Sequence, residues 1–294
     1  MDEIALKALL EAGCHFGHKV DRWHPKASPF IYQAREGIHV IDLAQTKAGL
    51  TRAAQFVKAL TLKGGMVLFL GTKRQASSVI KEESVRVGVP FISHRWIGGF
   101  FTNWEQVRKN LEKIRRLEEE EKSGAWKKYP KHERIKLMRY LRRLHEFYGG
   151  VANITALPDA IVVVDINREK VAVNEAVKMN IPVIAIVDTN SDPTPISYPI
   201  PANDDAVGSI KLLVSYLADA CHEGKLQAEK NQAAKDKEKG APTQVESIET
   251  QVKIDTVKPV KPKEVKDKKG DALNKKTRKP TMKKETVEKI KTAV

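Results

Sequence analysis

Residues 160–188, AIVVVDINREKVAVNEAVKMNIPVIAIVD, decide the fold. The two apolar runs at 160–165 and 182–188 are rich in β-branched residues, which is typical of strands buried on both faces of a parallel sheet. Between these runs, apolar residues recur at the spacing of a helix. A strand, a helix and a second strand joined by short links form a βαβ unit, in which the two strands are parallel.

The rest of the chain extends this alternation of strands and helices. The expected strands are 37–43, 66–71 and 90–92, and the expected helices are about 44–62, 73–88 and 204–220. Asn203 is a suitable N-cap for the last helix, which would place Asp204 and Asp205 in its first turn. This order predicts an α/β fold with a doubly wound, Rossmann- or flavodoxin-like sheet that is mostly parallel.

Residues 104–148 interrupt the alternation. Apolar residues recur every three or four positions in each half of this segment, and the polar stretch EEEEKSGAWKKYP separates the halves. The pattern predicts a protruding helical hairpin or short coiled coil, which is more often a docking arm than a catalytic element. The α/β domain is then made of residues 1–103 and 149–224.

The charge of the chain is unevenly spread. It carries 52 Lys and Arg against 37 Asp and Glu, a net charge of +15. Residues 225–294 contain 20 of these basic and 11 of these acidic residues but no aromatic residue. Such a segment has too little apolar surface to offset the entropy of ordering, so we expect a basic, disordered tail. The tail either attracts phosphate or only keeps the protein soluble, and composition does not decide between these roles.

Composition also excludes several classes of protein. No apolar run approaches the ~18 residues of a membrane span. The acidic start, MDEIALKALL, lacks the basic region of a secretory signal. Two cysteines do not make a disulfide framework. We expect a cytoplasmic protein with a polyanionic partner.

Two stretches combine arginine with tryptophan, namely HKVDRWHPK at 18–26 and HRWIGGFFTNWEQVRKN at 94–110. Arginine and lysine bind phosphate, and tryptophan offers a face on which bases stack. The basic pair in GTKR at 71–74 follows a strand and opens a helix, a position that favours phosphate. The predicted RNA-binding residues are Lys19, Arg22, Trp23, Lys26, Lys73, Arg74, Arg95, Trp96 and Arg108. The alternative is that some of the aromatic residues anchor the core.

Two groups of residues are candidates for a metal site. Cys14, His15, His18 and His24 are residue types that bind zinc, but their spacing matches no standard structural site. They would otherwise hydrogen-bond to the backbone or to nucleic acid. We therefore predict no metal there.

The second group is made of Asp165, Asp188, Asp204 and Asp205, which follow strands or begin a helix. Clustered at the carboxyl edge of the sheet, they would hold a divalent ion or include a phosphoacceptor. The alternative, which we favour, is that they cap backbone N–H groups. The prediction is accordingly a protein without a metal or cofactor.

Seven blocks of the sequence together resemble a known family. In order they are GCHFGH, RWHPKASPFIY, GIHVIDLAQT, LGTKRQA, HRWIGGFFTNW, LPDAIVVVD and IPVIAIVDTNSDP. Their types and order are similar to those of the bacterial-type ribosomal protein S2 family of the small ribosomal subunit, over about residues 1–226. The lysine-rich tail is longer than is usual in that family, so the resemblance says nothing about its role.

The resemblance implies a doubly wound α/β domain with a protruding coiled-coil hairpin and a structural role without catalysis. It implies binding to small-subunit rRNA between head and body, support of subunit assembly, and contact with other small-subunit proteins. Members of the family help to anchor protein S1 near the mRNA exit. The expected location is the cytoplasmic ribosome, with no membrane contact and no homo-oligomer.

The sequence leaves two other functions as alternatives. The first is an enzyme that binds a nucleotide or sugar phosphate on the sheet, although neither G-x-G-x-x-G nor G-x-x-x-x-G-K-[ST] occurs. The second is a regulatory module with a phosphoacceptor aspartate. Neither accounts for the ordered set of blocks.

Overall fold

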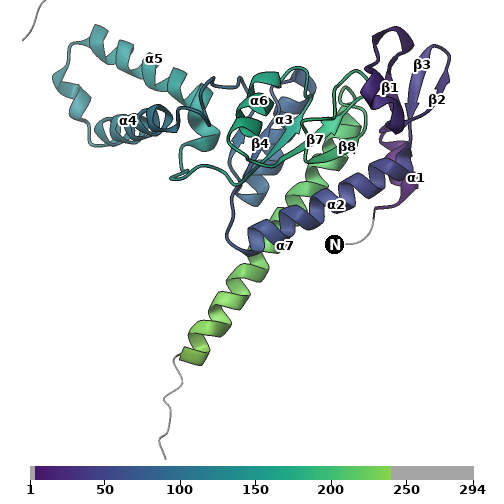
Figure 1. Ribbon diagram of the computed structural model, residues 1–294. Helices are drawn as coiled ribbons and strands as arrows, with labels where there is room; N and C mark the ends of the chain where they lie inside the picture. The colour runs from purple at the N-terminus through teal and green to yellow at the C-terminus, as the bar shows by residue number, and fades with distance from the viewer. Residues whose placement is uncertain (1–3, 240–294) are drawn as a thin grey trace, which may run out of the picture. The chain divides into compact units, whose positions relative to one another are not determined.

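A five-stranded parallel sheet forms the centre of the protein, in a computed structural model that describes residues 4–239, with side chains to residue 231. The strand order is β5-β4-β6-β7-β8, and every neighbouring pair is parallel. The strands are β4 (Val67–Leu70), β5 (Phe91–Ile92), β6 (Ala160–Val164), β7 (Val183–Val187) and β8 (Tyr198–Pro201) (Figure 1). Every residue of β4, β6 and β7 is buried, as the apolar runs predict.

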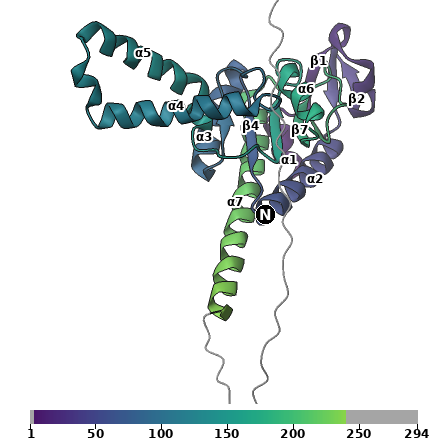
Figure 2. The ribbon, with the colours of Figure 1, turned by 60° about the vertical axis from the view of Figure 1, so that its left-hand side comes forward.

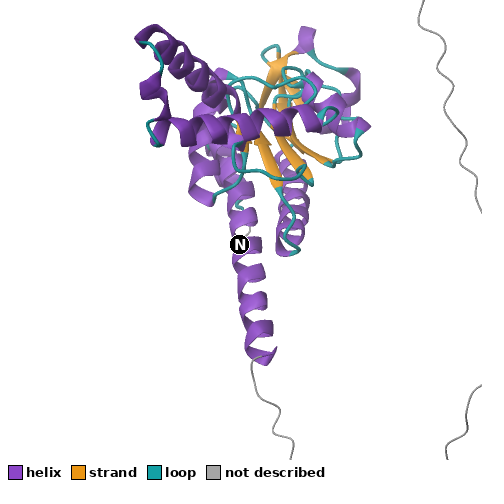
Figure 3. Cartoon of the chain, turned by 90° about the vertical axis from the view of Figure 1, so that its left-hand side faces the viewer, coloured by secondary structure: helices purple, strands orange, loops and turns teal. Residues whose placement is uncertain are grey.

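Helices cover both faces of this sheet, and the alternation of side chains along each strand divides the core in two. On one face, Phe69, Val162 and Ile184 pack with helices α2 (Leu43–Leu62), α3 (Arg74–Val87) and α7 (Val207–Lys239). On the other face, residues such as Leu68 and Ile161 pack with α6 (Lys170–Lys178) and the base of the helical hairpin. Figure 3 shows helices flanking the orange strands. The predicted doubly wound α/β fold and its βαβ unit are confirmed.

The strand expected at 37–43 belongs to a different sheet. Strands β1 (Phe16–Lys19), β2 (Ile31–Arg35) and β3 (Ile38–Ile41) form an antiparallel sheet in the order β1-β3-β2, beside the short helix α1 (Leu6–Glu11). Glu36 and Gly37, with φ of 53° and 77°, make the two-residue turn between β2 and β3. Two consecutive positive φ values are those of a hairpin turn whose twist matches the strands. This local pairing takes β3 away from the main sheet.

The predicted helical hairpin is present. It is formed by α4 (Trp104–Lys122) and α5 (Lys131–Tyr148), which project from the sheet in Figure 2. The apolar repeat is buried at Val107, Leu111, Ile114, Leu117 and Leu141. Asn103 occupies the N-cap position of α4, although its side chain makes no capping hydrogen bond.

The last helix starts later and ends later than predicted. It begins at Val207, and the side chain of Asn203 accepts N–H groups of Asp205 and Ala206 just before it. It continues to Lys239, so residues 225–239 of the predicted tail are helical. The reason lies in residues 226–239, which consist mostly of good helix formers without Gly or Pro. The remainder of the predicted tail, 240–294, lies outside the described residues.

Within residues 4–239, no helix is both long and apolar enough to cross a membrane.

Candidate nucleic-acid interface

The carboxyl ends of the parallel strands bring the predicted RNA-binding segments to one edge of the sheet. Strand β4 leads into residues 72–74, and β5 leads into 94–96. Residues 18–26 reach the same edge because the segment after β7 binds them. The backbone N–H groups of His18 and His24 donate to the hydroxyl and the carbonyl of Thr189, at 2.9 and 2.8 Å. Segments far apart in the sequence thus share one surface.

Most of the predicted basic residues are exposed there. Among the described residues, no partner is found for the charged groups of Lys19, Arg22, Arg74 and Arg95. Lys26 pairs with Asp192 at 2.8 Å in an exposed ion pair. Arg108 lies on α4 and pairs with Glu112 at 3.4 Å, with both side chains 60% exposed. Exposed pairs of this kind contribute little and open readily toward another anion.

Arg95 lines an open hollow of about 620 Å³. Arg168, which follows β6, lines the same hollow, and its Nε donates to Thr72 Oγ1 at 3.1 Å. His94 is a further neighbour, paired with Glu146 of α5 at 2.8 Å. Sequence reasoning missed Arg168, although its place just after a predicted strand was a usable signal. Two guanidinium groups at one hollow suit a phosphate group.

Trp96 does not offer a stacking face, contrary to the prediction. Its side chain is 8% exposed, and its indole N–H donates to Glu175 at 3.2 Å. The alternative role as a core anchor therefore applies, because Trp96 packs against Phe100 and Phe101 beneath the hairpin. Trp23 is 40% exposed, and its ring lies 5.6 Å from that of His39. Of the two predicted stacking residues, only Trp23 has an accessible face.

Lys73 is also unsuited to the predicted phosphate contact. Its ammonium lies 2.7 Å from Asp204, 2.6 Å from Asp205 and 3.2 Å from Asp165, and its side chain is only 13% exposed. Burial alone would lower the pKa of Lys73, but hydrogen bonds to Asp204 and Asp205 outweigh it and raise the pKa. Lys73 neutralises carboxylates within the protein.

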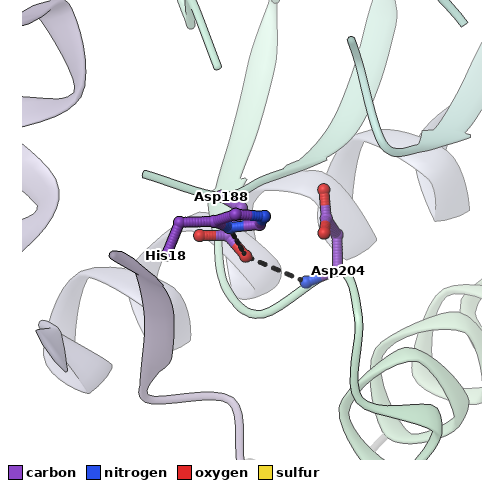
Figure 4. Close-up of side chains that lie close together, drawn as sticks. All are labelled: His18, Asp188 and Asp204. Atoms are coloured by element: carbon purple, nitrogen blue, oxygen red, sulfur yellow. Dashed lines mark hydrogen bonds and ion pairs between the residues drawn. The ribbon is translucent and has the colours of Figure 1, made fainter. Parts of the chain in front are cut away.

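Neither of the two candidate metal groups comes together as a whole. Cys14 is fully buried in the core, and the ring of His24 accepts the N–H of Lys26. Within the described part of the chain, the one group of three such residues whose ligand atoms all lie within 4.8 Å of one another is His18, Asp188 and Asp204 (Figure 4). His18 comes from the first candidate group, and Asp188 and Asp204 come from the second. The favoured capping role holds in part, since Asp165 accepts the N–H of Arg168.

The three residues form a tightly coupled cluster. His18 Nδ1 lies 3.0 Å from Asp188 Oδ2, and this hydrogen bond raises the pKa of His18 despite burial, which lowers it. Burial, with the charges of Asp188 and Asp165, raises the pKa of Asp204 to about 7. Because Asp188 follows β7 and His18 lies on β1, the cluster joins the antiparallel sheet to the edge of the main sheet.

Residues 9–224 match the sequence model of the family described as ribosomal protein S2. The chain belongs to the ribosomal protein S2 family. The fold and the ordered sequence blocks agree with this assignment. Membership of this family also confirms the prediction of a structural ribosomal protein and not an enzyme.

Three relatives illustrate the similarity. The chain is 49% identical over 222 residues to small ribosomal subunit protein uS2c of Porphyra purpurea, covering 76% of this chain and 92% of the relative. It is 47% identical over 225 residues to small ribosomal subunit protein uS2 of Microcystis aeruginosa, covering 76% of this chain and 85% of the relative. It is 46% identical over 225 residues to uS2 of Synechocystis sp., covering 76% and 84%.

The S2 family match includes the edge of the sheet and the whole α4–α5 hairpin. The part of α7 beyond residue 224 lies outside it. The candidate interface thus belongs to the part of the chain shared with the family.

Proposed function

We propose that the protein is a structural constituent of the small ribosomal subunit that binds small-subunit rRNA at the carboxyl edge of its sheet. The observation that carries the proposal is the exposed set of arginines and lysines without internal partners at that edge. Membership of the S2 family supports the ribosomal part, and no turnover is involved.

The RNA contacts follow from the chemistry of the edge. Arg95 and Arg168 at one hollow bind a phosphate through paired N–H donors. Lys19 and Arg22 are exposed near the segment after β7 and extend the positive surface. The exposed ring of Trp23 stacks on an unpaired base. Binding of this kind positions the protein through the RNA backbone and weakens with salt.

The hairpin provides a second surface. Residues 104–148 hold 14 basic and 8 acidic residues. Exposed arginines include Arg139, Arg142 and Arg143 on α5, while Met138 and Tyr140 on the same helix are 46% and 40% exposed. A surface on which exposed arginines alternate with exposed apolar side chains can bind an rRNA backbone or a neighbouring ribosomal protein.

Further roles rest on the resemblance to the S2 family. The protein supports assembly of the small subunit and helps to anchor neighbouring proteins near the mRNA exit, including protein S1 where one is present. It works as one copy on the cytoplasmic ribosome rather than as a homo-oligomer.

A double substitution tests the RNA contact. Arg95→Ala with Arg168→Ala should weaken retention of the protein on small subunits during a high-salt wash, because two phosphate contacts are lost. Lys63→Ala with Lys178→Ala removes the same charge at the opposite edge, before β4 and β7, and should have little effect. Equal retention of the two double variants would contradict the assignment of this edge, provided that both show the circular dichroism of the parent.

A further inference from the structure

The cluster of His18, Asp188 and Asp204 leaves one buried oxygen without a partner. Asp204 is 1% exposed, and its Oδ1 accepts from Lys73 at 2.7 Å. Its Oδ2 is buried and has no hydrogen-bond partner among the described residues. A buried carboxylate oxygen is costly unless a hydrogen bond or a cation satisfies it. A bound cation would satisfy this oxygen.

Asp188 and His18 also each place an atom that can bind a metal ion within the cluster. Asp188 Oδ1 is held by Thr189, whose N–H and hydroxyl lie at 2.5 and 3.1 Å, while Oδ2 faces His18. The His18 ring is held on both sides, with Nδ1 beside Asp188 and Nε2 3.1 Å from the amide of Asn190. Figure 4 shows His18 beside Asp188, and the backbone N–H of Asp204 donating to Asp188 Oδ2, at 3.5 Å. The side chains that would bind the ion are therefore held in position by the protein's own hydrogen bonds.

The charges point the same way. Four carboxylates meet here, since Asp165, Asp204 and Asp205 surround the ammonium of Lys73 and Asp188 faces His18. Among the described residues, Lys73 is the one permanent cation within ion-pair distance of Asp165, Asp204 and Asp205, and His18 is the one titratable base beside Asp188. Buried charges in proteins are paired or coordinate a metal. With His18 neutral, as a metal ligand must be, four ionised carboxylates face one ammonium, and a divalent ion would offset most of the remaining negative charge.

The donor types limit the choice of ion. One imidazole nitrogen with two carboxylate oxygens suits zinc, whereas calcium and magnesium prefer oxygen ligands alone. A histidine ligand whose second nitrogen has a polar partner is the usual arrangement at such sites. Asp205, which is 52% exposed and 3.5 Å from His18 Nε2, lies on the solvent side and leaves a way in for the ion.

We propose that His18, Asp188 and Asp204 form a binding site for a divalent transition-metal ion, with zinc as the best fit. The ion takes one ring nitrogen of His18, Oδ2 of Asp188 and the unpartnered Oδ2 of Asp204. Water or Asp205 completes the coordination. The ion joins β1 to the segments after β7 and β8, so it fixes the loop at 18–26 against the main sheet. The site does not depend on the proposed RNA contacts.

Zinc content of the purified full-length protein tests the site. The protein is stripped with a chelator, dialysed against Zn²⁺ with an excess of Mg²⁺, and measured by elemental analysis. We expect about one zinc per chain and a higher melting temperature with zinc than without it. X-ray absorption should show one imidazole with oxygen ligands and no sulfur. Failure to retain zinc, or sulfur in the first shell, would overturn the proposal without any variant.

Variants then locate the ion. Asp204→Asn and His18→Asn should each lower zinc affinity by more than the ~10–100-fold that loss of an outer-shell partner costs. Asp192→Asn is the matched control, since Asp192 lies in the same segment but pairs with Lys26. Circular dichroism checks that each variant is folded. Zinc retained by both cluster variants as tightly as by Asp192→Asn would also overturn the proposal.

Discussion

The indole Nε1 of Trp96 donates a hydrogen bond of 3.2 Å to Oε1 of Glu175 on α6. The same carboxylate accepts the backbone N–H of Gly99 at 2.7 Å and of Phe101 at 3.1 Å. One buried side chain therefore holds the segment that carries Arg95 and leads into the hairpin. The geometry of the proposed RNA contact therefore depends on a buried residue outside the exposed surface.

Replacing Glu175 by Ala should destabilise the protein by roughly 2–4 kcal/mol, because several buried donors lose their acceptor at once. Glu175→Gln should cost less, since the amide oxygen still accepts. Urea unfolding followed by tryptophan fluorescence measures both. A loss below about 0.5 kcal/mol for Glu175→Ala, the size of an ordinary surface change, would show that the segment is held by other contacts.

The two tryptophans of the Arg–Trp stretches should behave differently. Trp23→Ala should leave folding intact and weaken RNA binding by about 1–3 kcal/mol, the value of one stacked base. Trp96→Ala removes a buried side chain and should lower stability by roughly 3–5 kcal/mol. Binding to small-subunit rRNA and thermal unfolding, measured on the same samples, separate the two effects. Unchanged RNA binding by Trp23→Ala would remove Trp23 from the interface.

Glu169 makes stability depend on pH. It is 3% exposed, and burial raises its pKa above 4.5 even though the N–H and hydroxyl of Thr72 donate to it. The folded state therefore binds this proton more tightly than the unfolded state, and Glu169 destabilises the fold once it ionises. Glu169→Gln should be more stable than the parent at neutral pH.

This advantage should shrink as the pH falls through the raised pKa toward 4.5, the ordinary value, where the parent also becomes neutral. Urea unfolding of both proteins across that range measures the difference. An advantage that stays constant or grows toward acid pH would contradict the assigned cause.

Both cysteines should resist alkylation in the native protein. Cys14 and Cys221 are fully buried, and burial raises the pKa of Cys221 to about 12. The thiolate is the reactive form, so a thiol reagent at neutral pH should label neither residue until urea unfolds the chain. Mass spectrometry counts the labels. Rapid labelling of Cys221 without denaturant would show that α7 opens from the core.

Sequence alone predicted the elements whose pattern is local. The β-branched runs and the helical spacing between them sufficed for β6, α6 and β7, and the apolar repeat sufficed for the hairpin. It placed the strand around Val40 in the wrong sheet because the turn at Glu36 and Gly37 was not recognised. The extension of α7 does not follow from charge composition, which favours disorder, although helix propensity favours it.

The site was harder to predict because its contacts are not local. Lys73 was assigned to phosphate, yet three aspartates from the ends of different elements surround it. His18 and Asp188 were placed in separate candidate metal groups, although the structure brings them to 3.0 Å. Pairings between residues more than a hundred positions apart depend on how the antiparallel sheet packs, which periodicity does not report.

Sedimentation of a cell lysate through a sucrose gradient tests the central claim most directly. Fractions are probed for the protein before and after a high-salt wash. The account predicts that the protein migrates with small subunits and whole ribosomes at near one copy each, and that salt releases it only when the subunit's other RNA-bound proteins also begin to leave. Protein found mainly in the soluble fractions at the top of the gradient would contradict the account.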